Sequence, residues 1–309
     1  LKKNYGIGKV VNHCDFSETR VNPICSNFSE CGGCDLMHMN YQSQLAFKLQ
    51  MGNATFKRIG HLDFKIKNII GMDKPYNYRN KVQMPIGREK GKMITGFYKK
   101  KSHDIIKLDK CYIQPDESTE IAKLVKNICN DLLISSYDEK NKEGCLRHVI
   151  IRKTFDNEYM VVLVIFDDHK DNLIKLNELS YRIIQRNKNI KSIILNINKK
   201  VNNTILGLEY KALAGNDYLI EKILGLKFYM SHRAFFQINL KQTEKLYEKA
   251  LEYANISEND VVLDCYCGVG TISLLAAQKA KKVYGIEIVP EAINDAIKNS
   301  KLNNINNAE

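Results

Sequence analysis

The chain has 309 residues, of which 44% are hydrophobic and 27% charged, and a formal net charge of +12 at pH 7. This length predicts more than one domain, the charge favours a polyanionic partner such as nucleic acid, and no apolar run reaches the ~18 residues that a membrane span needs. The first residues, LKKNYGIGKV, lack the apolar core of a signal peptide. We therefore expect a cytoplasmic protein with no membrane partner, and nothing in the sequence indicates an obligate protein partner.

Residues 1–22 predict a short basic strand from Tyr5 to Val11, followed by a turn-rich link. Gly6 and Gly8 within the strand are typical of a bend in a small β-barrel. We interpret this segment as the end of such a barrel.

Three cysteines, Cys25, Cys31 and Cys34, stand in the string CSNFSECGGC, and Cys111 is the best candidate for a fourth ligand. Without a secretion signal, clustered cysteines are more often metal ligands or catalytic groups than disulfides. Zinc ribbons favour paired C-x2-C knuckles, and only one such pair occurs here. The spacing therefore favours an iron–sulfur cluster over zinc, with His13 and His38 as surface residues.

The segment from Arg79 to Cys111 carries ten basic residues against three acidic ones, with Tyr78, Phe97 and Tyr98 among them. Alternating side chains predict hairpins that point the basic residues outward. Cations and aromatic rings in one segment suit RNA, because phosphates pair with cations and bases stack on rings. On a later strand, Arg147, His148 and Arg152 either line an RNA channel or form a solvated strand face.

Apolar spacing predicts amphipathic helices at 40–59 and 116–134. Further predicted elements are strands at 146–154 and 159–166, a helix at 171–187, a strand at 191–198, a hairpin around Asn202-Asn203 and strands through Tyr229. From residue 231 the pattern becomes a helix at 240–254, a strand at 260–265, a helix at 271–280, a strand at 282–287 and a helix at 289–303. The first set predicts an α+β domain and the second the opening of a doubly wound sheet.

The string DCYCGVG places Asp264 at a strand end, followed by Gly268 and Gly270 and then a helix, and the next strand ends at Glu287. The glycines let the backbone approach a ligand closely, and Glu287 can accept hydrogen bonds from ribose hydroxyls. A dinucleotide fingerprint would prefer a third glycine where Ser273 stands. S-adenosylmethionine carries a cationic centre that suits Asp264, so it is favoured over NAD(P), and a turn without a ligand remains the third interpretation.

Together these residues resemble the bacterial 23S ribosomal RNA (uracil-5-)-methyltransferases of the RumA type over nearly the whole chain. The resemblance implies that Cys25, Cys31, Cys34 and Cys111 bind a [4Fe–4S] cluster. It further implies that Gln237 in FFQIN, together with Tyr266 and Thr271 in DCYCGVGT, contacts S-adenosylmethionine. Residues 1–22 look like the end of the family's TRAM barrel.

The resemblance also implies a mechanism in which a cysteine thiolate adds to C6 of uracil, so that C5 can accept a methyl group. The family's nucleophile and general-base segments have no counterpart here, and we expect both residues beyond residue 309. Cys267 is interpreted as a packing residue beside the cofactor and Cys265 as a core residue. With part of the sheet missing, we expect weak S-adenosylmethionine binding and no turnover by this chain alone.

The expected fold class is therefore a multidomain α/β and α+β protein. Its expected parts are the end of an OB-like TRAM barrel (1–22), an iron–sulfur cysteine loop (23–37), a central α+β RNA-binding domain (38–230) and the first half of a Rossmann-like methyltransferase domain (231–309). The helix at 40–59 is a candidate for packing on the last of these. Two alternatives remain: a noncatalytic iron–sulfur RNA-binding protein and an NAD-dependent iron–sulfur oxidoreductase.

Overall fold

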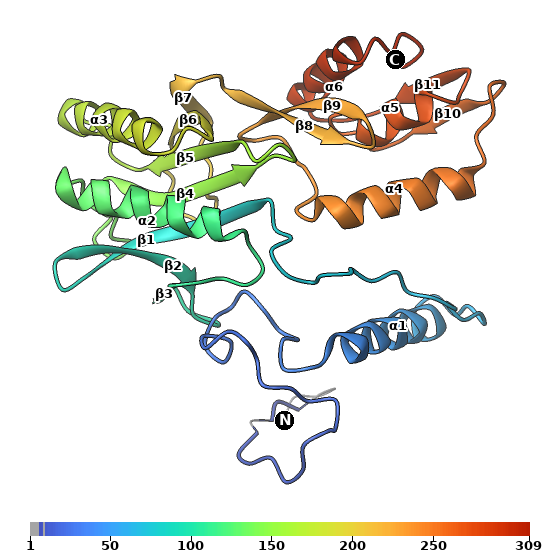
Figure 1. Cartoon of the computed structure of the whole chain (residues 1–309), viewed down its shortest axis with the longest axis horizontal. Helices are drawn as coiled ribbons and strands as arrows, with labels where there is room; N and C mark the ends of the chain where they lie inside the picture. The colour runs from blue at the N-terminus through green and yellow to red at the C-terminus, as the bar shows by residue number, and fades with distance from the viewer. Residues whose placement is uncertain (1–5, 9) are drawn as a thin grey trace. The chain divides into compact units, whose positions relative to one another are not determined.

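The computed structural model describes residues 6–8 and 10–309 (Figure 1). The chain divides into two compact units, Leu1–Gly71 and Met72–Glu309. The finer domain boundaries at residues 22, 37 and 230 stay a prediction. Among the described residues, no helix combines the length and the apolar character needed to cross a membrane.

The first unit contains one long helix, α1 (Tyr41–Arg58), which confirms the helix predicted at 40–59. The side chain of Asn40 caps it by accepting the backbone N–H of Ser43 at 2.9 Å. The strand predicted over Tyr5–Val11 is wrong for its described residues, which form no strand, while Tyr5 and Lys9 lie outside the described residues. No neighbouring strand is available to pair with this segment among the described residues of the unit.

The second unit is built on a seven-stranded sheet with the order β3-β2-β1-β4-β5-β6-β7. Its strands are β1 (Lys81–Glu89), β2 (Lys92–Tyr98), β3 (Ile105–Lys107), β4 (Leu146–Lys153), β5 (Tyr159–Ile165), β6 (Ile190–Ile197) and β7 (Glu209–Gly215). β5 and β6 are parallel and all other neighbours are antiparallel. A parallel pair needs a crossover connection, which α3 (Lys170–Arg186) supplies.

Two apolar layers cover the sheet. Alternate residues of β5 face opposite sides, so Val161 and Leu163 pack with α2 (Asp116–Asp131) and α3, whereas Val162 and Val164 pack with the C-terminal elements. β5 is buried along its whole length, as expected for a central strand covered on both faces.

The C-terminal elements follow the predicted order. They are β8 (Tyr218–Ile223), β9 (Leu226–Ser231), α4 (Leu240–Ala254), β10 (Val261–Asp264), α5 (Thr271–Ala277), β11 (Lys282–Gly285) and α6 (Pro290–Leu302). β8 and β9 form an antiparallel hairpin, and β10 and β11 form a parallel pair. Ala308 adds a parallel bridge to Val283 on the other side of β11. This arrangement confirms a mixed α/β fold, and the doubly wound sheet stays a prediction.

Candidate functional site

A cavity of about 940 Å³ lies within the second unit, between the ends of β10 and β11, the β8–β9 hairpin, α4 and α6. This volume is at the upper end of the ~300–1,000 Å³ that is usual for small-molecule sites. Six of the seven residues predicted to bind the cofactor line it: Gln237, Asp264, Tyr266, Gly268, Thr271 and Glu287. Gly270 is buried behind this lining.

The glycine turn after β10 needs its glycines for conformation. Gly268 and Gly270 have φ of 56° and 82°, a region that disfavours other residues. A Cβ on Gly270 would also lie 3.3 Å from the Cβ of Ala296. Gly270 therefore shapes the turn and its role in cofactor binding stays a prediction, while Gly268 lines the cavity itself.

The two predicted carboxylates sit on either side of this turn. Asp264 accepts the hydroxyl of Ser273 at 2.7 Å. Glu287 accepts the N–H groups of Gly268 at 3.2 Å, Ile288 at 2.8 Å and Val289 at 3.0 Å. A carboxylate has about four acceptor positions, so Glu287 retains about one for a ribose hydroxyl.

Gln237 reaches the cavity from a segment that is pinned to the central sheet. The Gln237 carbonyl accepts the side-chain amide of Asn80 at 3.1 Å, and the Asn80 N–H donates to the carbonyl of Ile238 at 2.9 Å. Arg79 forms a bridge with Asn239 one residue further on. The segment is therefore held through its own backbone atoms, which leaves the exposed Gln237 side chain for a ligand.

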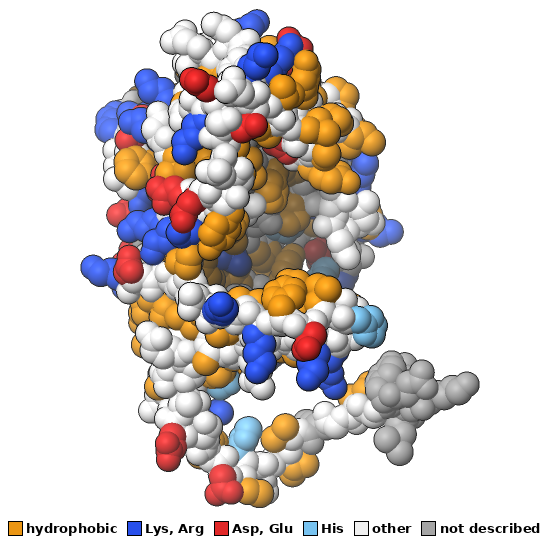
Figure 2. Space-filling view, turned by 90° about the vertical axis from the view of Figure 1, so that its right-hand side faces the viewer, with side chains coloured by type: hydrophobic (Ala, Val, Ile, Leu, Met, Phe, Trp, Pro, Cys, Tyr) orange, Lys and Arg blue, Asp and Glu red, His pale blue; other side chains and the backbone are white. Residues whose placement is uncertain are grey.

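The charge of the cavity contrasts with that of the chain. Its lining contains five carboxylates and two basic side chains, whereas the whole chain has a net charge of +12. Figure 2 shows basic side chains spread over the outer surface, with acidic ones between them. An acidic cavity favours a cationic ligand such as a sulfonium and disfavours the pyrophosphate of NAD.

The two cysteines near the turn differ from each other. Cys267 is buried, as predicted, and burial and the nearby Asp264 and Glu287 raise the pKa of its thiol. The prediction that Cys265 is a core residue is wrong, because its side chain is exposed. Cys265 directly follows β10, which belongs to a short two-stranded sheet.

The three basic residues on β4 are buried, so the predicted solvated strand face is wrong, while the RNA channel stays a prediction. Arg152 is only 1% exposed and donates to the carbonyls of Ser231 and Ala234, which fixes the turn leading to Gln237. Arg147 is buried too and donates to the carbonyls of Asn198 and Lys200 at 2.7 and 2.8 Å. A long arginine side chain can reach and hydrogen-bond carbonyl groups that are distant in the sequence. Such partners could not be identified from the sequence alone.

The predicted basic segment forms β1, β2, β3 and their turns. Eight of its ten basic side chains are exposed, but Arg79 and Lys81 are partly buried. Burial and the nearby Arg152 lower the pKa of Lys81 to about 8. The prediction that the basic side chains point outward is thus confirmed for eight of them and wrong for Arg79 and Lys81.

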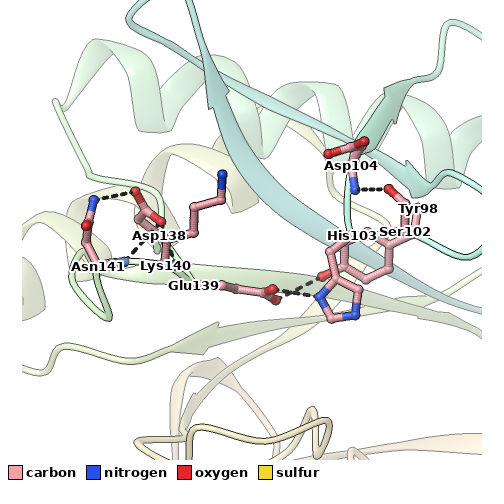
Figure 3. A network of polar contacts seen from close by, with 8 residues as sticks. All are labelled: Tyr98, Ser102, His103, Asp104, Asp138, Glu139, Lys140 and Asn141. Atoms are coloured by element: carbon pink, nitrogen blue, oxygen red, sulfur yellow. Dashed lines mark hydrogen bonds and ion pairs between the residues drawn. The ribbon is translucent and has the colours of Figure 1, made fainter.

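The turn between β2 and β3 carries Lys99, Lys100 and Lys101, and a polar network anchors it (Figure 3). Glu139 accepts His103 Nδ1 at 2.6 Å and the Tyr98 hydroxyl at 3.5 Å, and the two rings stack at 4.9 Å. Asp138 holds the loop that presents Glu139, accepting the N–H of Lys140 at 2.8 Å. The lysine turn is therefore an ordered cationic surface.

The cysteine loop of the first unit is a succession of turns. Cys31 is buried, its N–H donates to the carbonyl of Asn27 at 2.7 Å, and its sulfur accepts the N–H of Gly33 at 3.4 Å. Cys111 is also buried, in the second unit. Among the described residues, no three or more His, Cys, Asp or Glu side chains are grouped closely enough to hold a metal ion.

Comparison with known proteins gives the family. The model for tRNA (uracil-5-)-methyltransferases matches residues 40–309. The chain belongs to this family. An uncharacterized RNA methyltransferase of Clostridium tetani is 44% identical over 309 residues, and one of Clostridium acetobutylicum is 45% identical over 313 residues. Each match covers 100% of this chain and 67% of the relative.

A solved relative shares the fold of this uracil-5-methyltransferase family member. It is the Pyrococcus abyssi tRNA (uracil-54, C5)-methyltransferase in complex with S-adenosyl-L-homocysteine, with a TM-score of 0.72 and 25% identity. The match covers 95% of this chain and 65% of that one, so this chain spans just under two thirds of the solved relative. The predicted RNA methyltransferase is confirmed at the level of the family, and neither alternative function finds support.

Sequence reasoning missed the remaining walls of the cavity in this family member. Ala292, Asp295 and Lys298 line it from α6, and their spacing of three residues places them on one helix face. Tyr247 of α4 lines it as well, with its hydroxyl 3.5 Å from that of Thr271. For α6, the spacing of three residues could have indicated from the sequence that these side chains share one helix face. No local pattern distinguishes Tyr247 from an ordinary core residue.

Proposed function

We propose that the chain binds S-adenosylmethionine in the 940 Å³ cavity and serves in methyl transfer to C5 of a uridine in 23S ribosomal RNA. The observation that carries the proposal is the acidic lining around the glycine turn in a chain of net charge +12. Family membership supports uracil C5 as the acceptor. The resemblance in the cysteine cluster favours ribosomal over transfer RNA, and a cytoplasmic location follows from that substrate.

In this proposal S-adenosylmethionine supplies an electrophilic methyl group when it is bound. Asp264 and Glu287 attract and orient its cationic and ribose portions, and Gly268 allows close backbone approach. Gln237, which also lines the cavity, would contact it through its side-chain amide. Tyr266, Thr271 and the turn shaped by Gly270 complete the site, so these seven residues are our proposed cofactor site.

The acceptor base requires activation by a cysteine thiolate at C6 and removal of the C5 proton by a general base. We assign neither role to a cysteine beside the turn. Cys267 is buried with a raised thiol pKa, and Cys265 does not line the cavity. Reactivity needs an accessible thiolate in electropositive surroundings, so neither cysteine is proposed as the nucleophile.

Titration calorimetry tests the cofactor assignment. S-Adenosylhomocysteine and S-adenosylmethionine should bind the purified chain, and NAD⁺ should not. Asp264→Asn and Glu287→Gln should each weaken binding by roughly tenfold or more, because each removes charge-assisted contacts. Glu258→Gln, at an exposed position outside the cavity, is the matched control. Binding of NAD⁺ in place of S-adenosylhomocysteine would overturn the proposal.

Substrate choice needs a separate assay. Transfer of labelled methyl groups to unmodified 23S ribosomal RNA and to unmodified transfer RNA should be compared, using a protein with a downstream nucleophile and base as well as the present chain. We expect label in ribosomal RNA with the former and no turnover with the latter. Label confined to transfer RNA would replace the ribosomal assignment with the alternative substrate.

We also propose that Cys25, Cys31, Cys34 and Cys111 ligate a [4Fe–4S] cluster. What supports the proposal is the type of donor, because four thiols are the usual ligands of such a cluster, and the N–H of Gly33 already donates to the sulfur of Cys31. Such a cluster would fold the loop rather than catalyse, because four cysteines leave no open iron position. Anaerobically purified protein should contain about four iron and four sulfide per chain, and Cys31→Ser should lose both. Stoichiometric zinc would contradict the assignment.

A further inference from the structure

The cavity has a second wall that the proposed cofactor residues do not use. We call it the tyrosine wall; its members come from β7, β8, β9 and the residue after β9, and they are Tyr210, Tyr218, Tyr229 and His232. It is separate in sequence from the glycine turn and from Glu287. A cavity of about 940 Å³ has room for a second group beside a bound cofactor.

His232 is the unusual member of this wall. Its side chain is 2% exposed, it lines the cavity, and both ring nitrogens lack a hydrogen-bond partner among the described residues. Buried polar atoms are normally paired, and an unpaired one costs about 1–3 kcal/mol. His232 therefore contributes to the cavity wall an imidazole whose two buried nitrogens are unpaired among the described residues, which is the chemistry that a polar ligand would satisfy.

The protonation state of His232 limits the ligand. Burial, followed by the nearby Arg233, Arg152 and Lys81, lowers its pKa to about 4, and only Asp217 acts in the opposite direction. The ring is therefore neutral at pH 7 and offers one donor and one acceptor. A neutral ring in an acidic cavity does not attract phosphate. It matches a neutral group that also carries a donor beside an acceptor, as the edge of uracil does.

The tyrosines supply flat apolar surface next to this imidazole. The Tyr210 ring lies 4.3 Å from the ring of His232, and Tyr218 and Tyr229 meet edge to face at 4.7 Å. Strand pairing fixes this arrangement, because Tyr218 pairs with Ser231, the residue before His232. Stacking of a base on an aromatic side chain contributes about 1–3 kcal/mol.

We propose that the tyrosine wall holds a nucleobase of the RNA substrate, stacked on a tyrosine ring and hydrogen-bonded along its edge by His232. This inference rests on the proposed function, in which the opposite wall holds the methyl donor. The wall thereby selects a base by its edge, and His232 is a specificity-determining residue. It makes no bond to the reacting carbon and is not assigned a catalytic role.

Fluorescence anisotropy of the full chain tests this with two labelled probes and saturating S-adenosylhomocysteine. One probe is a uridine dodecamer, and the other is an abasic oligonucleotide of the same length and charge. The wild type should prefer the uridine probe by roughly tenfold or more. His232→Leu and Tyr210→Leu should each reduce the affinity for the uridine probe by roughly tenfold and leave the abasic probe unchanged.

His232→Leu also carries a second readout. Because the imidazole has no partner to lose among the described residues, its replacement by an apolar side chain of similar size should leave the melting temperature equal or higher. His232→Gln, which keeps a donor and an acceptor, should retain most of the preference for uridine. His169→Ala and Tyr181→Leu, both exposed at α3, are the matched controls and should behave as wild type.

The outcomes separate the two proposals. If the wild type does not bind S-adenosylhomocysteine, the proposed function fails. If the cofactor binds but both leucine variants keep the wild-type preference, or lose affinity for both probes equally, only the tyrosine wall assignment fails. A His232→Leu variant that melts earlier and binds uridine normally would show a structural role and overturn the inference.

Discussion

At the scale of single residues, Asn299 of α6 joins the two walls of the cavity. Its buried side chain accepts the N–H of Tyr229 at 2.7 Å and donates to the carbonyl of Val269 at 2.9 Å. Tyr229 belongs to β9 and Val269 to the glycine turn. One amide therefore satisfies a backbone donor on one wall and a backbone acceptor on the other.

Asn299→Leu should lower the free energy of unfolding by about 2–4 kcal/mol, because it leaves both backbone groups buried without a partner. Urea denaturation measures this change. Asn294→Leu places the same residue at an exposed position of the same helix and should change stability by less than about 0.5 kcal/mol. Equal effects of the two substitutions would contradict the role of Asn299.

Three buried titratable residues predict how stability depends on pH. Burial lowers the pKa of His148 and of His232 to about 4, so the unfolded chain binds more protons than the folded one between about pH 6.5 and 4. Stability then falls with falling pH, by up to ~1.4 kcal/mol per pH unit for each histidine. Burial raises the pKa of Glu221 to about 7, so its contribution has the opposite sign between about pH 4.5 and 7.

Glu221→Gln should therefore steepen the loss of stability on acidification. The amide can still accept from Phe155 and Lys222, whose N–H groups lie 2.8 and 2.9 Å from Oε1, but the opposing titration is gone. Melting temperatures of the wild type and the variant, measured from pH 7 to 4.5, should diverge towards acid. Parallel curves would mean that Glu221 ionises normally in the folded protein.

At the scale of elements, the pairing of β2 with β3 depends on Gly96. A Cβ at this position would lie 1.8 Å from the carbonyl oxygen of Ile106. β3 has only three residues. If a side chain at position 96 pushed it away from β2, few other paired residues would hold it in place. The lysine turn between the two strands is ordered through this contact as well as through Glu139.

Gly96→Ala should separate β3 from β2 and disorder the lysine turn. We expect weaker binding of both the uridine and the abasic probe, with a smaller slope of affinity against salt, because cations are lost without any loss of base contacts. S-Adenosylhomocysteine affinity should stay within about twofold of the wild type, since a twofold change corresponds to only ~0.4 kcal/mol. Gly91→Asn is the control, because its φ of 78° is one that Asn tolerates and its Cβ would meet no atom within 4 Å.

At the scale of the whole molecule, the second unit exposes one apolar strand face. Val261 and Leu263 of β10 are 61% and 59% exposed. Within the described part of the chain, β10 pairs with β11 and no strand lies along its other edge. Groups of exposed hydrophobic side chains are also visible in Figure 2. A strand with an open edge and an apolar face promotes association.

The isolated chain should therefore associate as its concentration rises, and Val261→Lys with Leu263→Lys should reduce this association. Added charge at an edge strand opposes edge pairing. Light scattering after size-exclusion chromatography gives the measurement. Ile174→Lys with Tyr181→Lys adds the same charge at exposed positions of α3 and should leave association unchanged. A similar reduction by both pairs would indicate a general effect of charge.

The sequence predicted the elements of the second unit well because their signals are local. Helical and alternating periods lie within each segment, and glycines mark the turn at Gly268 and Gly270. Partners that depend on distant backbone are not local, so the buried roles of Arg147 and Arg152 were not predictable. The tyrosine wall escaped prediction for the same reason, since its rings come from three strands and no spacing relates Tyr210 to His232.

Asn299 has a thermodynamic consequence for the two walls that it joins. Because one side chain holds β9 and the glycine turn together, a ligand that orders one wall reduces the entropy that a second ligand must overcome at the other. We expect methyl donor and RNA to bind with positive cooperativity. The factor by which each tightens the other must be the same, because linkage is reciprocal. In Asn299→Leu, the factor by which each ligand tightens the binding of the other should fall towards one. This should hold even if the affinity for each ligand alone is unchanged.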